Sequence, residues 1–333
     1  MRNVIVELKN LSVHFDMKRG FLEDMLSKEK KVLKAVDGVS FEIRQGEVLS
    51  LVGESGSGKT TTGKAILDLV PATGGEILFQ GRPMMTADRK YMKNFRQKAQ
   101  MIYQDPYQSM NPRDILMDII AEPLDVNGLA GTPEERMEKV VAALEHAGLT
   151  PAGEYLHRYP FEISGGQRQR VAIASAMIME PDFIVADEPV SMLDASIRTG
   201  ILKLMLELQK KKELAYLFIT HDLSLAWLIS DRIAIMYLGR IMEIGRADDV
   251  IKRGLHPYTK ALTDIMPIPG VNAGKERVIL PGETPDPTEV LTGCKFRSRC
   301  SMATSVCSEI CPELKKAGPD HLVACHHINQ EAE

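Results

Sequence analysis

The first 293 of the 333 residues contain no cysteine, and the chain has no long apolar run. The missing cysteines exclude a disulfide framework over most of the chain, as is usual in a reducing compartment. A membrane-spanning helix needs roughly 18 consecutive apolar residues, and the longest candidate, Val171 to Met179, is far too short. The N-terminal MRNVIVELKN has interspersed charges and no apolar core, so it does not resemble a signal peptide. We therefore expect a cytoplasmic protein without a membrane span of its own.

A strong charge of one sign is also lacking, because 41 Lys and Arg face 45 Asp and Glu for a net charge of -4. A general nucleic-acid binder would be strongly basic, so we expect no nucleic-acid partner. The length exceeds one average domain and predicts a large domain with an extension. A Pro-rich stretch over residues 266–287 marks the boundary between residues 1–265 and residues 266–333.

Short apolar strands followed by helices are what the chain does contain, and they predict an α/β fold with a largely parallel, doubly wound sheet. The expected strands cover residues 1–15, 39–43, 48–52, 76–79, 183–186 and 217–220, with a hairpin over 232–236 and 240–244. The expected helices cover residues 60–69, 137–146, 166–179, 197–212 and 222–229, within a mostly helical segment over about 105–180. Residues 16–32 are charged and irregular, and we expect a solvated loop or short helix there. In such folds the ligand site lies at the carboxyl ends of the strands.

A phosphate-binding loop follows the strand at 48–52. Gly53-Glu54-Ser55-Gly56-Ser57-Gly58-Lys59-Thr60 matches the P-loop pattern, in which bare backbone N–H groups converge on phosphate oxygens. Lys59 supplies a charge for the β- and γ-phosphates, and the Thr60 hydroxyl can bind Mg²⁺. The alternative, a flexible Gly/Ser turn, is disfavoured by the apolar strand before the loop and the helix after it. The P-loop alone leaves kinase, GTPase and ATPase open.

An acidic pair, Asp187 and Glu188, ends the apolar strand FIVADE. Asp187 stands where a Walker B aspartate holds the Mg²⁺ shell, and Glu188 could polarise an attacking water. A solvated acidic pair is common at strand ends, so the pair carries weight only together with the P-loop.

A second anion-binding surface is predicted at Ser164-Gly165-Gly166-Gln167, directly before a helix. Preceded by Ile163, this segment resembles the ABC signature LSGGQ. Further matches occur in order: Gln104 in MIYQDP resembles the Q-loop, Asp194 in SMLD the D-loop with Met192 for the usual Ala, and His221 in FITHD the switch histidine. The chain is thus similar to ABC ATPases over residues 1–265, which implies an ABC-type P-loop NTPase domain with a RecA-like core and a helical subdomain at about 105–180.

The resemblance implies roles for the matched residues. Glu188, His221 and Gln104 would be catalytic, and Thr60, Gln104 and Asp187 would hold Mg²⁺. Phe15 would stack on adenine, and the other nucleotide contacts would come from Gly53 to Thr61 (including Thr61 itself), Asp187, Ser164, Gly165, Gly166, Gln167 and Asp194. The cofactors are then ATP and Mg²⁺.

A closer resemblance, to ATPase subunits of oligopeptide, dipeptide and nickel importers, is carried by AVDGVSF, YQDPYQSMNPR, HPYTKAL and the tail GCKFRSRC. It implies transport-coupled ATP hydrolysis by a head-to-tail dimer at the cytoplasmic face of the membrane. The partners would be two transmembrane permeases, a paralogous ATPase subunit or a second copy, and indirectly an external solute-binding protein. A soluble ABC ATPase, a non-ABC P-loop enzyme and an inactive regulatory protein are the alternatives, and the solute stays open.

All five cysteines lie in the extension, over residues 266–333, with Cys294, Cys300, Cys307 and Cys325 spaced C-x5-C-x6-C-x17-C and Cys311 additional. Thiols this dense in a reducing compartment indicate metal binding. The wide gaps favour a 4Fe–4S cluster, which the importer resemblance also implies, over Zn²⁺ with its paired C-x2–4-C knuckles. Buried thiols without metal are the third reading. His321, His326 and His327 are possible substitute ligands, though we expect them to be solvated.

Overall fold

The computed structural model describes residues 3–17, 32–266, 282–286, 288 and 292–328. The chain divides into two compact units, each built from separate segments. The first comprises residues 1–6, 43–47 and 79–218, and the second comprises residues 7–42, 48–78 and 219–333. Most of the loop predicted over 16–32 and most of the Pro-rich stretch over 266–287 lie outside the described residues.

The second unit is built on two groups of strands. Their bounds are β1 Val4–Asp16, β2 Val32–Arg44, β3 Val48–Val52, β4 Gly74–Phe79, β9 Arg232–Tyr237, β10 Arg240–Arg246, β11 Lys315–Gly318 and β12 His321–Val323. One group has the order β2-β1-β4, and the other has the order β11-β12-β10-β9-β3. Strand β3 runs parallel to β9, while β9-β10, β10-β12 and β11-β12 are antiparallel.

Burial explains why these strands form where the sequence predicts them. All five residues of β3 are buried, as is typical of a central parallel strand with both faces covered. The β9–β10 hairpin turns at Gly239, whose φ of +81° is a conformation that glycine adopts without strain. The prediction of β3 and of this hairpin is therefore confirmed.

The helices of the second unit are α2 Lys59–Ile66, α8 Leu223–Ile229, α9 Ala247–Lys252, α10 Pro257–Ile265 and α11 Ser305–Glu309, with a 3-10 turn η4 at Arg297–Arg299. An aromatic cluster joins the extension to this unit. Tyr237 on β9, Tyr258 on α10 and Phe296 before η4 lie with their ring centroids 4.9–5.3 Å apart and are almost fully buried. Such pairs contribute about 0.5–1.5 kcal/mol each beyond their buried area.

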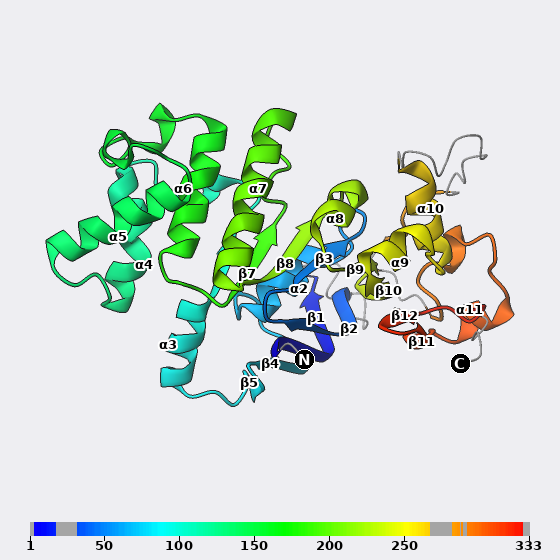
Figure 1. Cartoon of the computed structure of the whole chain (residues 1–333). Helices are drawn as coiled ribbons and strands as arrows, with labels where there is room; N and C mark the ends of the chain where they lie inside the picture. The colour runs from blue at the N-terminus through cyan, green and yellow to red at the C-terminus, as the bar shows by residue number, and fades with distance from the viewer. Residues whose placement is uncertain (1–2, 18–31, 267–281, 287, 289–291, 329–333) are drawn as a thin grey trace, which may run out of the picture. The chain divides into compact units, whose positions relative to one another are not determined.

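The first unit carries the helical segment. Its elements are β5 Arg82–Pro83, α3 Arg89–Lys98, β6 Ala99–Ile102, η1 Pro106–Ser109, α4 Leu116–Asn127, α5 Pro133–His146, η2 Ala152–Glu154, η3 Pro160–Glu162, α6 Gly165–Met177, β7 Phe183–Asp187 and α7 Ala195–Lys212. Strand β8 (Ala215–Thr220) neighbours β7, which pairs in parallel with β6. Helices α4, α5 and α6 lie together (Figure 1) around a core that includes Leu116, Ile120, Val140, Leu144 and Val171. The prediction of a mostly helical segment over 105–180 is confirmed.

Local signals set the ends of α5. Thr132 and Glu135 form a reciprocal capping box at its start, with Pro133 in the first turn. Gly148, with φ +73°, follows its end, and the N–H of Leu149 donates to the carbonyl of Leu144 at 2.9 Å. This arrangement satisfies carbonyls that the last helical turn leaves without partners.

Some boundaries differ from the prediction. Strand β2 begins at Val32 rather than at residue 39, because Lys34 and Asp37 interrupt the apolar pattern without ending the strand. Helix α2 ends at Ile66 rather than at residue 69, where the chain closes into a turn. No helix is predicted over α3, because its sequence is mostly charged and its apolar side is short, with Phe95 buried and Tyr91 and Met92 half-buried.

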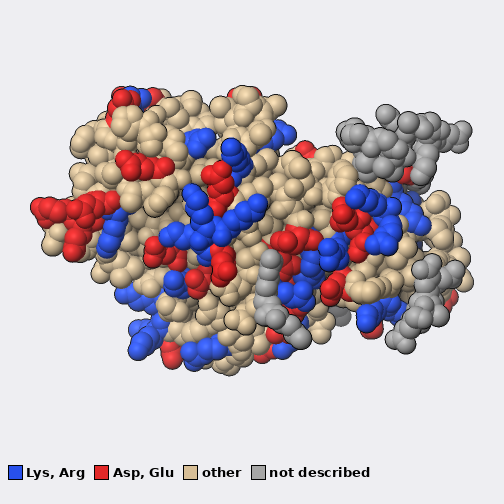
Figure 2. Space-filling view, viewed as in Figure 1, with Lys and Arg blue, Asp and Glu red and all other residues tan. Residues whose placement is uncertain are grey.

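Among the described residues, no helix is both long enough and apolar enough to cross a bilayer. On the face drawn in Figure 2, basic and acidic side chains are interspersed, as the nearly balanced composition predicts.

Candidate functional site

The P-loop connects β3 to α2 in the second unit, and close backbone contacts require two of its glycines, Gly53 and Gly58. A Cβ atom added to Gly53 would lie 2.1 Å from the Met236 carbonyl oxygen. At Gly58, where φ is +102°, a Cβ would lie 2.1 Å from the Ala35 carbonyl oxygen. No larger residue fits at either position without moving the backbone. The loop is thus a tightly curled, bare main chain, the form that brings N–H groups to an anion.

Lys59 lies inside this curl. Its Nζ donates to the carbonyl oxygens of Gly53 and Glu54, both at 2.8 Å, and to the Ser57 hydroxyl at 3.3 Å. The side chain is only 6% exposed, so the ammonium is held at a fixed place in the loop. A fixed positive charge beside convergent N–H groups suits a polyphosphate.

Helix α2 completes the phosphate-binding surface. Thr60 and Thr61 occupy its first turn, where the helix dipole favours negative charge. The Thr62 hydroxyl, in contrast, donates to the Gly58 carbonyl and is fully buried, so it fixes the loop to the helix. Ser55 and Gly56 are exposed at the loop's tip. The residues present therefore fit a nucleotide phosphate group, with Thr60 as a possible Mg²⁺ ligand.

Two more predicted residues belong to this unit. His221 follows β8 and is exposed, directly before Asp222, whose carboxylate caps α8 by accepting from the N–H of Leu225 at 3.0 Å. Phe15 lies near the end of β1 with 38% of its surface exposed, as a ring that stacks on a base must be.

The acidic pair belongs to the first unit, at the end of β7. Asp187 is 6% exposed on that fully buried strand. Glu188 follows with φ +45°, a left-handed conformation that is uncommon for a residue with a side chain. Its carboxylate accepts a 2.9 Å hydrogen bond from the side-chain amide of Gln104. The structure therefore brings the two predicted catalytic residues Gln104 and Glu188 into direct contact.

The signature segment starts α6 in the same unit. Ser164 is the N-cap: its hydroxyl accepts from the Gln167 N–H at 3.3 Å, while the Gln167 side chain accepts from the Ser164 N–H at 2.9 Å. A Cβ at Gly166 would lie 2.5 Å from the Ile197 Cγ2 on α7, which accounts for the glycine there. Gly165 has no such crowding, since its nearest neighbour would be Leu193 at 3.9 Å.

Asp194 caps α7 in the predicted D-loop. Its carboxylate accepts from the Ser196 hydroxyl at 2.6 Å and from the Ile197 N–H at 3.0 Å. These hydrogen bonds, the one from Ser196 first, hold the pKa of Asp194 below its usual value. The residue is thus an anionic cap of a helix in this structure.

The predicted residues therefore fall into two sets. The P-loop, His221 and Phe15 belong to the second unit, whereas Gln104, Asp187, Glu188, the signature and Asp194 belong to the first.

The cysteines lie in the second unit as free thiols. The Cys294 N–H donates to the Cys307 carbonyl at 2.8 Å, and the Cys307 Sγ lies 3.6 Å from the His327 Nε2. Burial, with a smaller contribution from neighbouring thiolates, raises the pKa of Cys294 to about 11. Four thiols have the donor chemistry for an iron–sulfur cluster or for zinc. Within the described part of the chain, however, no three His, Cys, Asp or Glu side chains are arranged to hold a metal ion, so metal binding stays a prediction.

The expectation that the tail histidines are solvated is wrong for His321. Its ring is 6% exposed, and its Nε2 lies 2.7 Å from a carboxylate oxygen of the buried Glu243. The other oxygen of Glu243 accepts from the His256 N–H at 2.9 Å. His321 is therefore occupied as a structural partner, which residue spacing could not reveal.

A contact between the extension and the nucleotide loop could not be predicted from the sequence. Arg299 of η4 donates to the carboxylate of Glu54, the second residue of the P-loop, at 2.9 and 3.0 Å. The sequence shows Arg299 beside Cys300, but it does not indicate that the partner of Arg299 is Glu54, which lies far away along the chain.

Comparison with known proteins agrees with this arrangement. Residues 36–191 match the ABC transporter family, and residues 242–307 match the C-terminal region of oligopeptide/dipeptide transporters. The oligopeptide transport ATP-binding protein AppF of Bacillus subtilis is 43% identical over 98% of both chains. The oligopeptide transport ATP-binding protein OppF of the same organism is 49% identical over 84% of this chain and 87% of its own.

A solved structure gives the same fold. The ATP-binding cassette MJ0796, a dimer in a post-hydrolysis state bound to ADP and phosphate, is 27% identical and superposes with a TM-score of 0.63, covering 73% of this chain and 99% of its own. The 43% identity to AppF extends over nearly the whole length of both chains. This chain therefore belongs to the ABC transporter family, as an ATP-hydrolysing subunit of the group that carries the oligopeptide/dipeptide transporter C-terminal region.

Proposed function

We propose that this subunit hydrolyses ATP to power the import of peptides through an ABC transporter. The observation that carries the proposal is the curled P-loop around Lys59, a complete cradle for a polyphosphate. The peptide substrate is supported by the names of the two Bacillus subtilis relatives, both oligopeptide transport ATP-binding proteins. In this proposal residues 1–265 form the ATPase domain, and residues 266–333 form the extension.

The residues have distinct parts in the reaction. Lys59 neutralises the β- and γ-phosphates, and His221 contacts the γ-phosphate. Glu188 accepts a proton from the attacking water, and the hydrogen bond from Gln104 orients its carboxylate.

Two further contacts complete the nucleotide site. Thr60, Asp187 and Gln104 would hold Mg²⁺, which when bound neutralises charge on the phosphates. The ring of Phe15 stacks on adenine.

The active form is a head-to-tail dimer in which the signature of one subunit contacts the nucleotide held by the P-loop of the other. The capped start of α6 at Ser164 supports this role, because helix N-termini favour anions. The dimeric state of the MJ0796 cassette also supports it. One chain then needs two anion-binding surfaces because it contributes half of each of two sites.

The membrane partners follow from the family. We propose that the ATPase pair, made of this chain and a paralogue or a second copy, binds two transmembrane permeases at the cytoplasmic face of the membrane. The segment containing Gln104 contacts the permeases. An external solute-binding protein delivers the peptide, so the solute is selected by subunits other than this one.

Reconstitution tests the proposal. The complete transporter in vesicles should take up labelled peptide only with ATP on the side of this subunit. Glu188→Gln should abolish uptake, whereas Glu207→Gln, the same change at an exposed position of α7, should not. Uptake that continues unchanged in Glu188→Gln would refute the proposal, and a ligand screen on the solute-binding protein identifies the solute.

For the extension, we propose a structural 4Fe–4S cluster on Cys294, Cys300, Cys307 and Cys325, with Zn²⁺ as the alternative. The number and clustering of thiols in one unit support it. Anaerobically purified protein should contain iron and sulfide and be brown. Colourless protein without iron would refute the cluster, and stoichiometric zinc would establish the alternative.

A further inference from the structure

Two basic residues of the extension contact segments of the nucleotide site, and the function assigned to that site does not require either contact. Arg299 is 8% exposed, and its Nη1 lies 2.9 and 3.0 Å from the two carboxylate oxygens of Glu54. A charge-assisted hydrogen bond from a buried guanidinium is stronger than an exposed ion pair, because water screens the two charges little.

Three more contacts hold the same P-loop residue. The Thr284 hydroxyl also donates to the Glu54 carboxylate. The N–H of Glu54 donates to the Tyr258 hydroxyl at 3.2 Å, and its carbonyl accepts from Lys59. The extension thus fixes both the side chain and, through the aromatic cluster that Tyr258 forms with Phe296, the backbone of Glu54.

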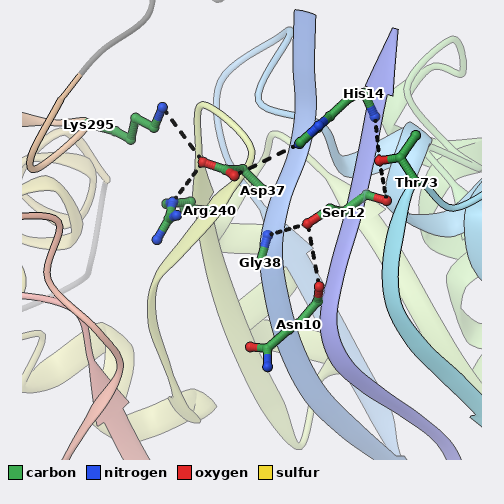
Figure 3. A network of polar contacts seen from close by, with 8 residues as sticks. All are labelled: Asn10, Ser12, His14, Asp37, Gly38, Thr73, Arg240 and Lys295. Atoms are coloured by element: carbon green, nitrogen blue, oxygen red, sulfur yellow. Dashed lines mark hydrogen bonds and ion pairs between the residues drawn. The ribbon is translucent and has the colours of Figure 1, made fainter.

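The second contact starts from Lys295, four residues earlier. Its Nζ lies 3.7 Å from the Oδ2 of Asp37 on β2, and the Arg240 Nε lies 3.0 Å from the same oxygen (Figure 3). The other oxygen of Asp37 faces the His14 Nε2 at 3.9 Å.

Asp37 connects Lys295 to both strands that lie beside Phe15, the proposed adenine contact: it belongs to β2 and faces His14 of β1. His14 directly precedes Phe15 on β1, and its N–H donates to the Thr73 hydroxyl at 3.2 Å. The Gly38 N–H on β2 donates to the Ser12 hydroxyl of β1 at 3.2 Å, so the two strands are linked here (Figure 3).

We propose that Arg299 and Lys295 are positioning residues for ATP: through Glu54 and Asp37 they hold the P-loop and the strands beside Phe15 in the conformation that binds nucleotide. The physical reason is pre-organisation. A loop rich in glycine has many conformations to lose, and a loop fixed beforehand loses fewer when ligand binds. The proposal rests on the proposed function of this site.

The test is ATP turnover and nucleotide binding in the dimer. Arg299→Ala should raise KM for ATP and the Kd for nucleotide by about 5- to 20-fold, in the range of typical couplings between sites, and leave kcat near the wild-type value. Arg299→Lys should recover part of the affinity because it keeps the charge. Arg297→Ala is the matched control, since Arg297 lies on the same turn but donates to the carbonyl of Thr292.

Glu54→Gln tests the same contact from its P-loop side, because it removes the negative charge that Arg299 binds. It should weaken nucleotide binding similarly, and the double variant Glu54→Gln/Arg299→Ala should be no worse than either single change, because both remove one interaction. Additive effects would show that Arg299 acts elsewhere. If Arg299→Ala does not fold, Glu54→Gln alone decides, and unchanged nucleotide affinity overturns the role of Arg299.

Lys295→Met tests the contact between Lys295 and Asp37. We expect the KM for ATP to rise and kcat to stay the same, and an unchanged KM would overturn the positioning role of Lys295. Lys59→Ala separates the inference from the proposed function. If Lys59→Ala binds ATP as the wild type does, the proposed function fails. If Lys59→Ala loses ATP while Arg299→Ala and Lys295→Met do not, only the positioning role fails.

Discussion

The side-chain amide of Gln104 donates a 2.9 Å hydrogen bond to the carboxylate of Glu188. Gln104 lies two residues after the end of β6, and Glu188 directly follows β7, the strand paired with β6. The bond therefore ties the proposed general base to the segment proposed to contact the permeases. If that segment contacts the permeases as proposed, its movement would displace the base and so connect transport with hydrolysis.

Replacing Glu188 by Gln should separate binding from hydrolysis. The amide cannot accept the proton of the attacking water, so kcat should fall about 10²- to 10⁴-fold. ATP affinity should be kept, and a closed dimer should accumulate with ATP, detectable by gel filtration. Hydrolysis at the wild-type rate would show that another group is the base.

Replacing Gln104 by Ala should have a smaller effect on the same step. The carboxylate loses the donor that orients it, and we expect kcat to fall about tenfold, with the Kd for nucleotide measured without Mg²⁺ almost unchanged. Gln100→Ala is the control, because the Gln100 side chain donates to the Arg96 carbonyl and not to an acidic residue. Equal effects of the two changes would argue against an orienting role for Gln104.

Replacing Lys59 by Ala should abolish nucleotide binding. The change removes the charge inside the loop and leaves the carbonyls of Gly53 and Glu54 without their donor. A fluorescent nucleotide should show at least about a 100-fold weaker Kd, as expected for losing a buried charged partner of a phosphate. Lys64→Ala, on the same helix, should bind normally; a wild-type Kd in Lys59→Ala would contradict the proposed site.

Acid should destabilise the chain through His256. Burial lowers the pKa of this side chain to about 4, from an ordinary 6.5 in the unfolded chain. The folded form binds its proton more weakly, so stability is complete above about pH 6.5 and is lost as pH falls from about 6.5 through 4. At about pH 5 the expected loss from this group is about 2 kcal/mol.

His256→Asn isolates this effect. The His256 ring accepts from the Tyr258 N–H as the cap of α10, and asparagine can cap a helix without titrating. Urea unfolding at about pH 7.5 and about pH 5 should show a smaller loss of unfolding free energy in the variant than in the wild type. The same loss in both would show that other groups cause the acid sensitivity.

The central strands and the motif residues could be predicted because local sequence determines them. Strand β3 is a continuous apolar run, and the P-loop glycines at 53 and 58 are required by backbone contacts that no other residue fits. Contacts between distant segments could not be predicted. Glu54 and Arg299 meet where the aromatic cluster of Tyr237, Tyr258 and Phe296 and the pairing of β12 with β10 pack the extension onto its unit.

Charged and polar segments were the second feature that the sequence did not predict correctly. Helix α3 is capped by Asp88, whose carboxylate accepts from the Tyr91 N–H at 2.7 Å, and it buries one residue, Phe95, whose ring centroid lies 4.9 Å from that of Phe79. His321 was expected in water, yet it lies beside the buried Glu243, which residue type alone could not indicate. The contact between His321 and Glu243 is polar and specific, and hydrophobic patterning carries no information about it.

In the proposed dimer, each nucleotide is shared between the P-loop of one subunit and the signature of the other. A Ser164→Ala subunit and a Lys59→Ala subunit are each prepared as dimers of this chain, mixed, and assayed for ATP turnover. Each unmixed dimer damages both of its sites, whereas a mixed dimer keeps one intact site, because both changes fall on the other. We predict that mixing restores turnover, up to about a quarter of the wild-type rate when half of the dimers are mixed and each site works independently. If mixed dimers form, as shown by differently tagged subunits purifying together, but hydrolyse ATP no faster than the unmixed variants, the nucleotide is not shared between the two subunits.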